Sequence, residues 1–88
     1  MKKASPPTAR EVFAYNLRRS RRIRDISQEQ LALRAGLSRS YISGIERGER
    51  NVSIDNMGIL AQTLAVPLKD LVNPDFFKAV DGRSSNLD

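Results

Sequence analysis

Apolar side chains recur at intervals of three or four residues along most of the chain, a spacing typical of amphipathic helices. Before the first such stretch, Thr8 and Glu11 have the spacing of a capping box, in which each side chain accepts from the other residue's backbone N–H. The pattern predicts a first helix from Thr8 to about Asp25. Its apolar anchors are Val12, Phe13 and Leu17. The sequence shows neither an alternating strand pattern nor an internal repeat.

The second helical pattern is short and ends at a glycine. Ser27 and Gln30 have the spacing of a second capping box, so we predict a helix from Gln28 to Ala35. Gly36 can end this helix in the left-handed conformation, which a residue with a Cβ atom resists. The small residue also allows the next helix to pack against this one at a steep angle.

The third helical pattern is apolar on one side and carries small polar and basic residues on the other. Ser38 is the expected cap of a helix from Arg39 to Arg47, with Ile42 and Ile45 in the core. Gly44 inside this helix is about 1 kcal/mol less favourable than alanine, so we expect another surface to approach it closely. The side opposite the core carries Arg39, Ser40, Ser43, Gly44 and Arg47.

The residue pattern in the last part of the chain predicts two further helices and a final helical turn. Ser53 caps a fourth helix that runs to about Ala65. Its buried face is expected to carry Ile54, Met57, Leu60, Ala61 and Leu64. Pro67 suits the start of a short fifth helix over residues 68–72. A last turn is expected over residues 75–80, with Asp75 as its cap.

Charge and composition narrow the possible functions. The 88 residues fit one small domain and carry a net charge of +5. Residues 1–50 hold twelve Lys and Arg against five Asp and Glu, whereas residues 51–88 hold three against five. This asymmetry favours a polyanionic partner for the basic half, although a solvated arginine-rich helix would have the same charge. Five of the arginines fall within residues 18–24, so at least one should point inward or be paired.

Several classes of protein do not fit this composition. The chain contains no cysteine and no histidine, which excludes disulfides, thiolate metal sites, catalytic imidazole and the usual zinc-finger spacings. The sequence also lacks a Gly-rich phosphate loop and an apolar run long enough to cross a membrane. We therefore expect a cytoplasmic, non-enzymatic protein without a metal or other cofactor.

Two short helices joined by a glycine-containing turn form the helix-turn-helix pattern. In this motif the second helix enters the DNA major groove, so its outer face must offer hydrogen-bonding groups. The first helix is short and crosses the phosphate backbone. The segment from Ser27 to Arg47 meets each requirement.

The same segment resembles a known family. The runs are Gln28-Glu-Gln-Leu-Ala, Gly36-Leu-Ser and Tyr41-Ile-Ser-Gly-Ile-Glu-Arg-Gly48. They resemble the Cro/cI-type (XRE) helix-turn-helix regulators of bacteria and phages, and the likeness extends over roughly residues 17–72. More narrowly, residues 39–47 together with Arg50-Asn-Val-Ser resemble the controller proteins of restriction–modification systems.

The resemblance implies an all-α, compact five-helix, lambda-repressor-like DNA-binding domain with a central helix-turn-helix. On this basis residues 1–7 form a flexible N-terminal arm and residues 8–72 form the domain. The motif itself spans residues 28–47. Residues 73–88 form a short C-terminal extension, which is expected to begin with a dimer contact and to end in a frayed tail.

The resemblance also implies positions that face the bases. These are Arg39, Ser40, Ser43 and Gly44. Arg39 is the best candidate for direct readout, because a guanidinium can bind guanine O6 and N7 together, with about 1–3 kcal/mol of discrimination. The alternative is an exposed Arg39 without a base contact. If Gly44 approaches the floor of the groove, Gly44→Gln should change operator preference more than stability.

Other positions are implied to contact the DNA backbone or to brace the motif. Gln28 matches a residue that binds a phosphate and braces the recognition helix. The remaining backbone or groove-edge positions are Tyr41, Arg47, Arg50 and Asn51. The Tyr41 ring could instead pack on the second helix, and both roles can hold together. Arg21 and Glu46 match a pair that ties the first helix to the third.

Five residues near the C-terminus are too apolar for the exposed end of so small a domain, and we expect part of this set to form a two-fold interface. They are Leu68, Leu71, Val72, Phe76 and Phe77. In a homodimer, this interface would place two recognition helices one helical turn apart on a pseudo-palindromic operator. The alternative is that these residues close the core of the monomer.

These observations predict a homodimeric, sequence-specific transcriptional regulator. Its expected partners are a double-stranded DNA operator, a second copy of the chain and, as a further candidate, RNA polymerase. The sequence does not distinguish a repressor from an activator. A second hypothesis is an antitoxin or another protein-interaction module that uses the same fold.

Overall fold

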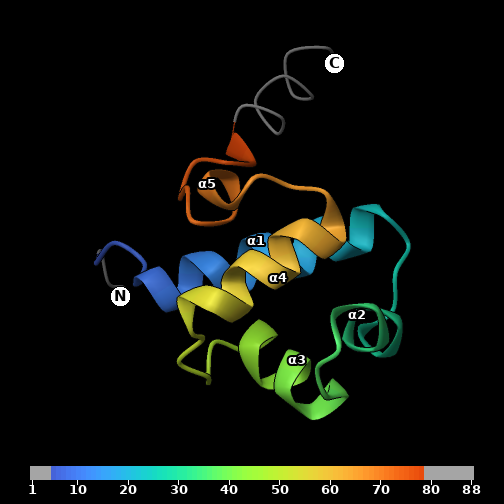
Figure 1. The fold of residues 1–88 in the computed structure, drawn as a ribbon. Coiled ribbons are helices and arrows are strands. Elements are labelled where there is room, and N and C mark those ends of the chain that lie inside the picture. Colours follow the sequence, from blue (N-terminus) through green and yellow to red (C-terminus); the bar gives the residue numbers. More distant parts are fainter. Residues whose placement is uncertain (1–4, 79–88) are drawn as a thin grey trace.

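The computed structural model describes residues 5–78 and is built from five α-helices (Figure 1). They are α1 (Ala9–Ile23), α2 (Gln28–Ala35), α3 (Arg39–Glu46), α4 (Ile54–Leu64) and α5 (Leu68–Leu71). No strand occurs between residues 5 and 78. The predicted all-α, five-helix class is therefore confirmed. The predicted arm and C-terminal extension lie partly outside the described residues.

The N-terminus of each of the first two helices is fixed by a capping box, as predicted. The Thr8 hydroxyl accepts from Glu11 N–H at 3.1 Å, and the Glu11 carboxylate accepts from Thr8 N–H at 2.9 Å. Ser27 and Gln30 exchange the same two bonds at 3.0 and 2.8 Å. Local side chains thus satisfy N–H groups that the helix itself leaves unpaired.

The first four helices end in one shared arrangement, in which a residue with positive φ reverses the chain. Gly36 (φ 72°) follows α2 and Gly48 (φ 74°) follows α3. Asp25 (φ 54°) and Ala65 (φ 56°) hold the corresponding places after α1 and α4. The next N–H in each case donates back into the helix, as from Val66 to the Ala61 carbonyl at 2.9 Å. This is the Schellman motif, which satisfies carbonyls at a helix end.

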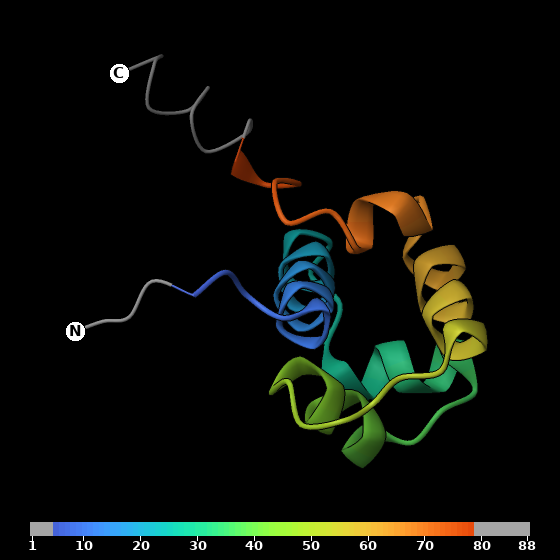
Figure 2. The same cartoon turned by 90° about the vertical axis from the view of Figure 1, so that its left-hand side faces the viewer.

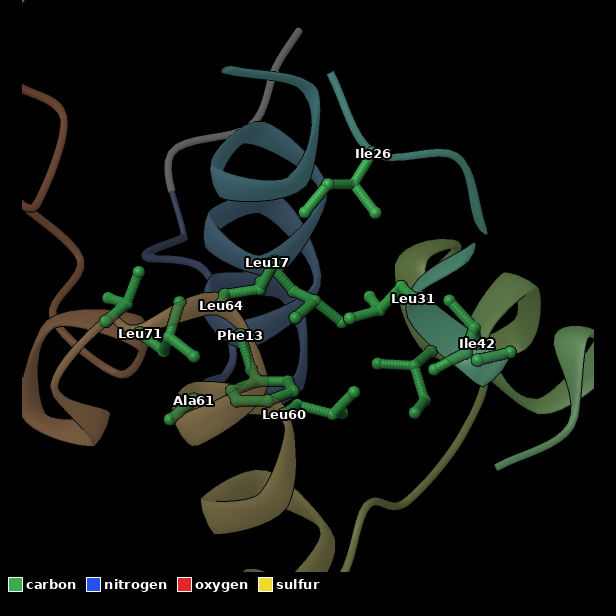
Figure 3. Close-up of a cluster of buried hydrophobic side chains, with 12 residues drawn as sticks. Phe13, Leu17, Ile26, Leu31, Ile42, Leu60, Ala61, Leu64 and Leu71 are labelled. Atoms are coloured by element: carbon green, nitrogen blue, oxygen red, sulfur yellow. The ribbon is translucent and has the colours of Figure 1, made fainter. Parts of the chain in front are cut away.

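The core lies between α1 and α4 and is closed by the other helices. The two views together show α2 and α3 on one side of this pair and α5 on the opposite side (Figures 1 and 2). Figure 3 shows buried side chains from all five helices meeting in one cluster. Leu17, Leu31, Ile42, Leu60 and Leu71 are completely buried there.

Two predictions about the fourth helix and the C-terminal turn are wrong. Ile54, expected on the buried face of α4, is 72% exposed because it is the first residue of that helix and lies at its end. Residues 74–77 form turns, and the side chain that accepts there is Asn73 Oδ1, which bonds Asp75 N–H at 2.9 Å. Asp75 therefore does not act as the predicted cap, and residues 79–80 lie outside the described range.

The described helices differ from what a membrane-spanning helix requires. None of them combines the length and the apolar character that crossing a lipid bilayer requires. Residues 5–78 also contain no group of three acidic side chains placed to hold a metal ion.

Candidate nucleic-acid interface

The turn between α2 and α3 is set by two short-range signals. Gly36 takes the left-handed conformation, and Leu37 N–H then donates to the Ala32 carbonyl at 2.9 Å. Ser38 starts α3, where its hydroxyl accepts from Tyr41 N–H at 3.1 Å. The apolar side of α3 packs into the core, because Ile42 is fully buried. The opposite side of α3 consequently faces outward.

A buried polar network fixes α3 against the two preceding helices. Arg21 donates to the Glu46 carboxylate through Nε at 2.6 Å and through Nη2 at 2.8 Å. Its Nη1 donates to the Ile26 carbonyl at 2.8 Å. Gln28 Nε2 adds a third bond to Glu46, at 3.1 Å. The structure confirms the predicted Arg21–Glu46 pair, the inward arginine and the bracing of α3 by Gln28.

The N-terminal half of the outward face of α3 is open to solvent. Arg39 and Ser40 are exposed. Within residues 5–78, the Arg39 side chain forms no hydrogen bond or ion pair. The Ser40 hydroxyl lies 3.5 Å from that of Ser38. Both side chains stand at the beginning of α3, the end of a recognition helix that contacts base edges in helix-turn-helix proteins.

The C-terminal half of this face contains an ion pair that the sequence analysis did not single out. Arg47 donates to the Ser43 hydroxyl and pairs with Glu49, whose Oε1 lies 3.0 Å from Nη2. Both members of the ion pair are more than half exposed. A carboxylate therefore lies beside Arg47, a predicted DNA-contacting residue. The sequence could have indicated this ion pair, because Glu49 follows directly after the glycine that ends α3.

Gly44 does not face outward as predicted but is buried beneath Arg50. The Arg50 guanidinium carbon lies 5.7 Å from the centre of the Tyr41 ring. Tyr41 is half-buried, and its hydroxyl accepts from Asn56 Nδ2 at 3.1 Å. Asn51 is exposed in the same loop. The predicted close approach at Gly44 is thus made by the protein's own side chain.

Two other arginines, one in α1 and one directly after it, contact nearby groups. Arg19 donates to the Tyr15 hydroxyl at 2.8 Å, and its guanidinium carbon lies 4.6 Å from the Phe77 ring centre. Arg24 donates to the Ser20 carbonyl at 3.0 Å. These contacts show that part of the arginine cluster stabilises the helix and its surroundings.

The proposed dimer residues divide into buried and accessible groups. Leu71 is completely buried and Phe77 is only 7% exposed, so the prediction that they form an exposed interface is wrong. Both close the core of the protomer, the alternative that the sequence left open. Leu68 and Phe76 are half-buried against the core, whereas Val72 is 43% exposed.

Asn16 explains why the segment after α4 folds onto α1. Its buried Nδ2 donates to the carbonyls of Asp70, Leu71 and Asn73, at 3.3, 3.1 and 2.9 Å. These carbonyls belong to the end of α5, where the helix itself provides no partners. These partners lie more than fifty residues from Asn16 in the sequence, so a short-range pattern could not reveal the contact.

Comparisons with known proteins agree with this geometry. The Helix-turn-helix family model matches residues 17–71. Control protein C.SmaI of Serratia marcescens is 41% identical over 73 residues, which cover 83% of this chain and 87% of that protein. The structure of the restriction-modification controller protein C.AhdI of Aeromonas hydrophila matches with a TM-score of 0.68 and 44% identity, over 70% of this chain and 94% of that one.

A further solved structure includes DNA. The restriction-modification controller protein C.Esp1396I is seen as a tetramer in complex with its natural 35 base-pair operator, and matches with a TM-score of 0.67 and 27% identity. The match covers 75% of this chain and 96% of that one. The family model includes all of α2, the turn and α3. The chain therefore belongs to the XRE-type helix-turn-helix family, and restriction-modification control proteins are among its homologues.

Proposed function

We propose that the protein is a sequence-specific transcriptional regulator that binds a pseudo-palindromic double-stranded DNA operator as a homodimer, with α3 in the major groove. The observation that carries the proposal is the outward polar face of α3, held rigidly from behind by the Arg21–Glu46–Gln28 network. A recognition helix needs such a fixed orientation, because its hydrogen bonds to base edges depend on position.

Arg39 is the proposed base-reading residue. It is exposed at the start of α3, and none of the other residues between 5 and 78 competes for its guanidinium by a hydrogen bond or ion pair. Ser40 and Ser43 can reach bases or phosphates. Tyr41, Arg47, Arg50, Asn51 and Gln28 are proposed to contact the DNA backbone or the groove edge.

A second copy of the chain is the proposed dimer partner. Val72 and the half-buried Leu68 and Phe76 offer accessible apolar surface near α5. The tetrameric assembly of C.Esp1396I on its operator supports oligomerisation in this family. A two-fold axis near α5 would present two copies of α3 to half-sites about 34 Å apart.

The relatives favour a role in controlling restriction–modification genes over an antitoxin role, since C.SmaI, C.AhdI and C.Esp1396I are all control proteins by name. In such a role the protein would act in the cytoplasm, without catalysis, and RNA polymerase is a further proposed partner. Analytical ultracentrifugation over a concentration series tests the homodimer, and a strict monomer at tens of micromolar, free and on DNA, would refute it.

DNA binding is tested with the DNA upstream of the protein's own gene. We expect tighter binding to this duplex than to a scrambled duplex, with an affinity that falls steeply as salt increases. Arg39→Ala should lower the ratio of specific to non-specific affinity by about five- to a hundredfold. Lys69→Ala on α5 is the control, because it removes one exposed charge on the opposite side of the molecule. Equal affinity of the unaltered protein for both duplexes would refute the proposal.

A further inference from the structure

Gly44 is covered by a side chain from the loop that follows its own helix. A Cβ atom at this position would lie 2.8 Å from Arg50 Cγ, 3.0 Å from Nε and 3.4 Å from Cδ. The first two distances are shorter than a comfortable van der Waals contact, so any larger residue would displace the arginine. The space that a side chain would occupy at Gly44 is therefore filled by the stem of Arg50.

The end of α3 directs Arg50 onto this position. Gly48 reverses the chain with φ 74°, and its N–H donates to the Ile45 carbonyl at 2.9 Å. Glu49 N–H then donates to the Gly44 carbonyl, also at 2.9 Å. These two bonds form a Schellman motif and bring the next residue back over the helix. The location of Arg50 is thus a consequence of backbone geometry.

The guanidinium end of Arg50 is held by a restrained aromatic ring. It lies 5.7 Å from the centre of the Tyr41 ring, within the range of a cation–π contact. The Tyr41 hydroxyl is bonded to Asn56 Nδ2, and Asn56 N–H is bonded to the Ser53 hydroxyl that caps α4. The aliphatic part and the guanidinium of Arg50 therefore both have defined positions before any DNA is bound.

We propose that Gly44 is a positioning residue for DNA binding: its missing side chain leaves the space in which Arg50 lies, so that the guanidinium is presented beside Tyr41 in one orientation. This rests on the proposed function and adds a cause for the glycine in the middle of α3. An arginine that is already ordered loses less side-chain entropy when it binds an oxygen acceptor on DNA.

The proposal is tested first without DNA. In 15N relaxation measurements, Arg50 Nε should be ordered in the unaltered protein and clearly more mobile in Gly44→Ala. Gly58→Ala is the matched control, because this glycine also lies inside a helix and a Cβ atom there would meet nothing within 4 Å. If Arg50 Nε in the unaltered protein is as mobile as that of the exposed Arg39, the proposal is wrong even if the protein binds its operator.

A double-mutant cycle on operator DNA gives the second test. Gly44→Ala should weaken binding by about two- to tenfold. In an Arg50→Ala background the same change should have almost no effect. An equal loss in both backgrounds would show that Gly44 acts independently of Arg50 and would overturn the proposal. The proposal would also be overturned if Arg50→Ala weakened binding to the operator while Gly44→Ala left the affinity unchanged.

The acceptor on DNA is identified by the same measurements. If the variants lose the same affinity for operator and scrambled DNA, and the salt slope falls by about one, the acceptor is a backbone phosphate. A loss confined to the operator indicates a base edge. Both results support the positioning role of Gly44, and circular dichroism with thermal unfolding establishes that each variant is folded. If the unaltered protein shows no preference for the operator, the proposed function fails, and the relaxation test still decides the placement of Arg50.

Discussion

The Arg21 guanidinium and the Glu46 carboxylate form a buried ion pair with two parallel hydrogen bonds, of 2.6 and 2.8 Å. The side chains are only 9% and 2% exposed. The pair joins α1 to α3, and Gln28 extends it to α2. The orientation of the recognition helix therefore depends on a contact that cannot itself touch a base.

We expect Glu46→Ala to destabilise the fold by about 3–5 kcal/mol, because it leaves the buried Arg21 charge without its partner. Urea unfolding followed by circular dichroism measures this change. Glu49→Ala is the control, since it removes a carboxylate from an exposed ion pair and should cost less than about 1 kcal/mol. Equal effects of the two substitutions would show that the buried pair has no special structural role.

Ala65 ends α4 in the left-handed conformation, with φ 56°. This conformation is about 1–2 kcal/mol unfavourable for a residue with a Cβ atom, whereas glycine adopts it freely. After allowance for the greater flexibility of glycine in the unfolded chain, Ala65→Gly should stabilise the protein by about 0.5–1 kcal/mol. The free energy of unfolding in urea checks the prediction.

Ala35→Gly is the matched comparison for this change. Ala35 is the last residue of α2 and does not have a positive φ. We expect its replacement to destabilise the protein by about 0.5–1 kcal/mol. The two substitutions should thus have opposite signs, and destabilisation by both would contradict the assignment of strain to Ala65.

The helix starts could be predicted from the sequence because their signals are local. Thr8 with Glu11, and Ser27 with Gln30, satisfy each other's backbone N–H groups within one turn. The helix ends were harder to predict from the sequence. Gly36 is recognisable because glycine favours positive φ, but Ala65 has no such signal. Its conformation is maintained by the burial of Val66 and by the bond from Val66 N–H to Ala61.

The candidate site was predictable in part, because helical spacing is also a local signal. Helical spacing placed Arg39 and Ser40 on the outer face, and the structure has them exposed. It also placed Gly44 there, but Arg50 returns from the following loop and covers it. Spacing shows which side of a helix a residue occupies. It does not show which distant residue covers that side, and the same uncertainty affected Leu71 and Phe77.

Asn16 is expected to be essential for holding α5 against α1. Asn16→Ala removes the donor shared by three carbonyls and should destabilise the protein by about 1–3 kcal/mol. Because α5 lies beside the proposed interface, the dimer should also weaken. Urea unfolding and analytical ultracentrifugation measure the two effects. Asn51→Ala removes an exposed amide and should change stability by less than about 0.5 kcal/mol, so a similar loss in both variants would refute the capping role.

Glu49 is expected to weaken DNA binding, because its carboxylate lies on the proposed DNA-facing side and occupies Arg47. Glu49→Gln removes a charge that repels phosphates and releases the Arg47 guanidinium. Binding to scrambled DNA should become about two- to fivefold tighter at low salt. The gain should shrink as salt increases, since the groups involved are exposed. Fluorescence anisotropy with a labelled duplex over a salt series measures both quantities.

Asp75→Asn separates this local effect from a change in net charge. Asp75 also forms an exposed ion pair, with Lys78 at 3.3 Å, but it belongs to the segment after α5, a helix that lies on the side of the molecule opposite α3. Both substitutions make the net charge more positive by the same amount. Because screening limits exposed charges to about 10 Å at 0.1 M salt, only Glu49→Gln should tighten binding appreciably. If both variants bind scrambled DNA equally tightly, then overall charge determines non-specific affinity, and the Arg47–Glu49 pair has no separate influence on it.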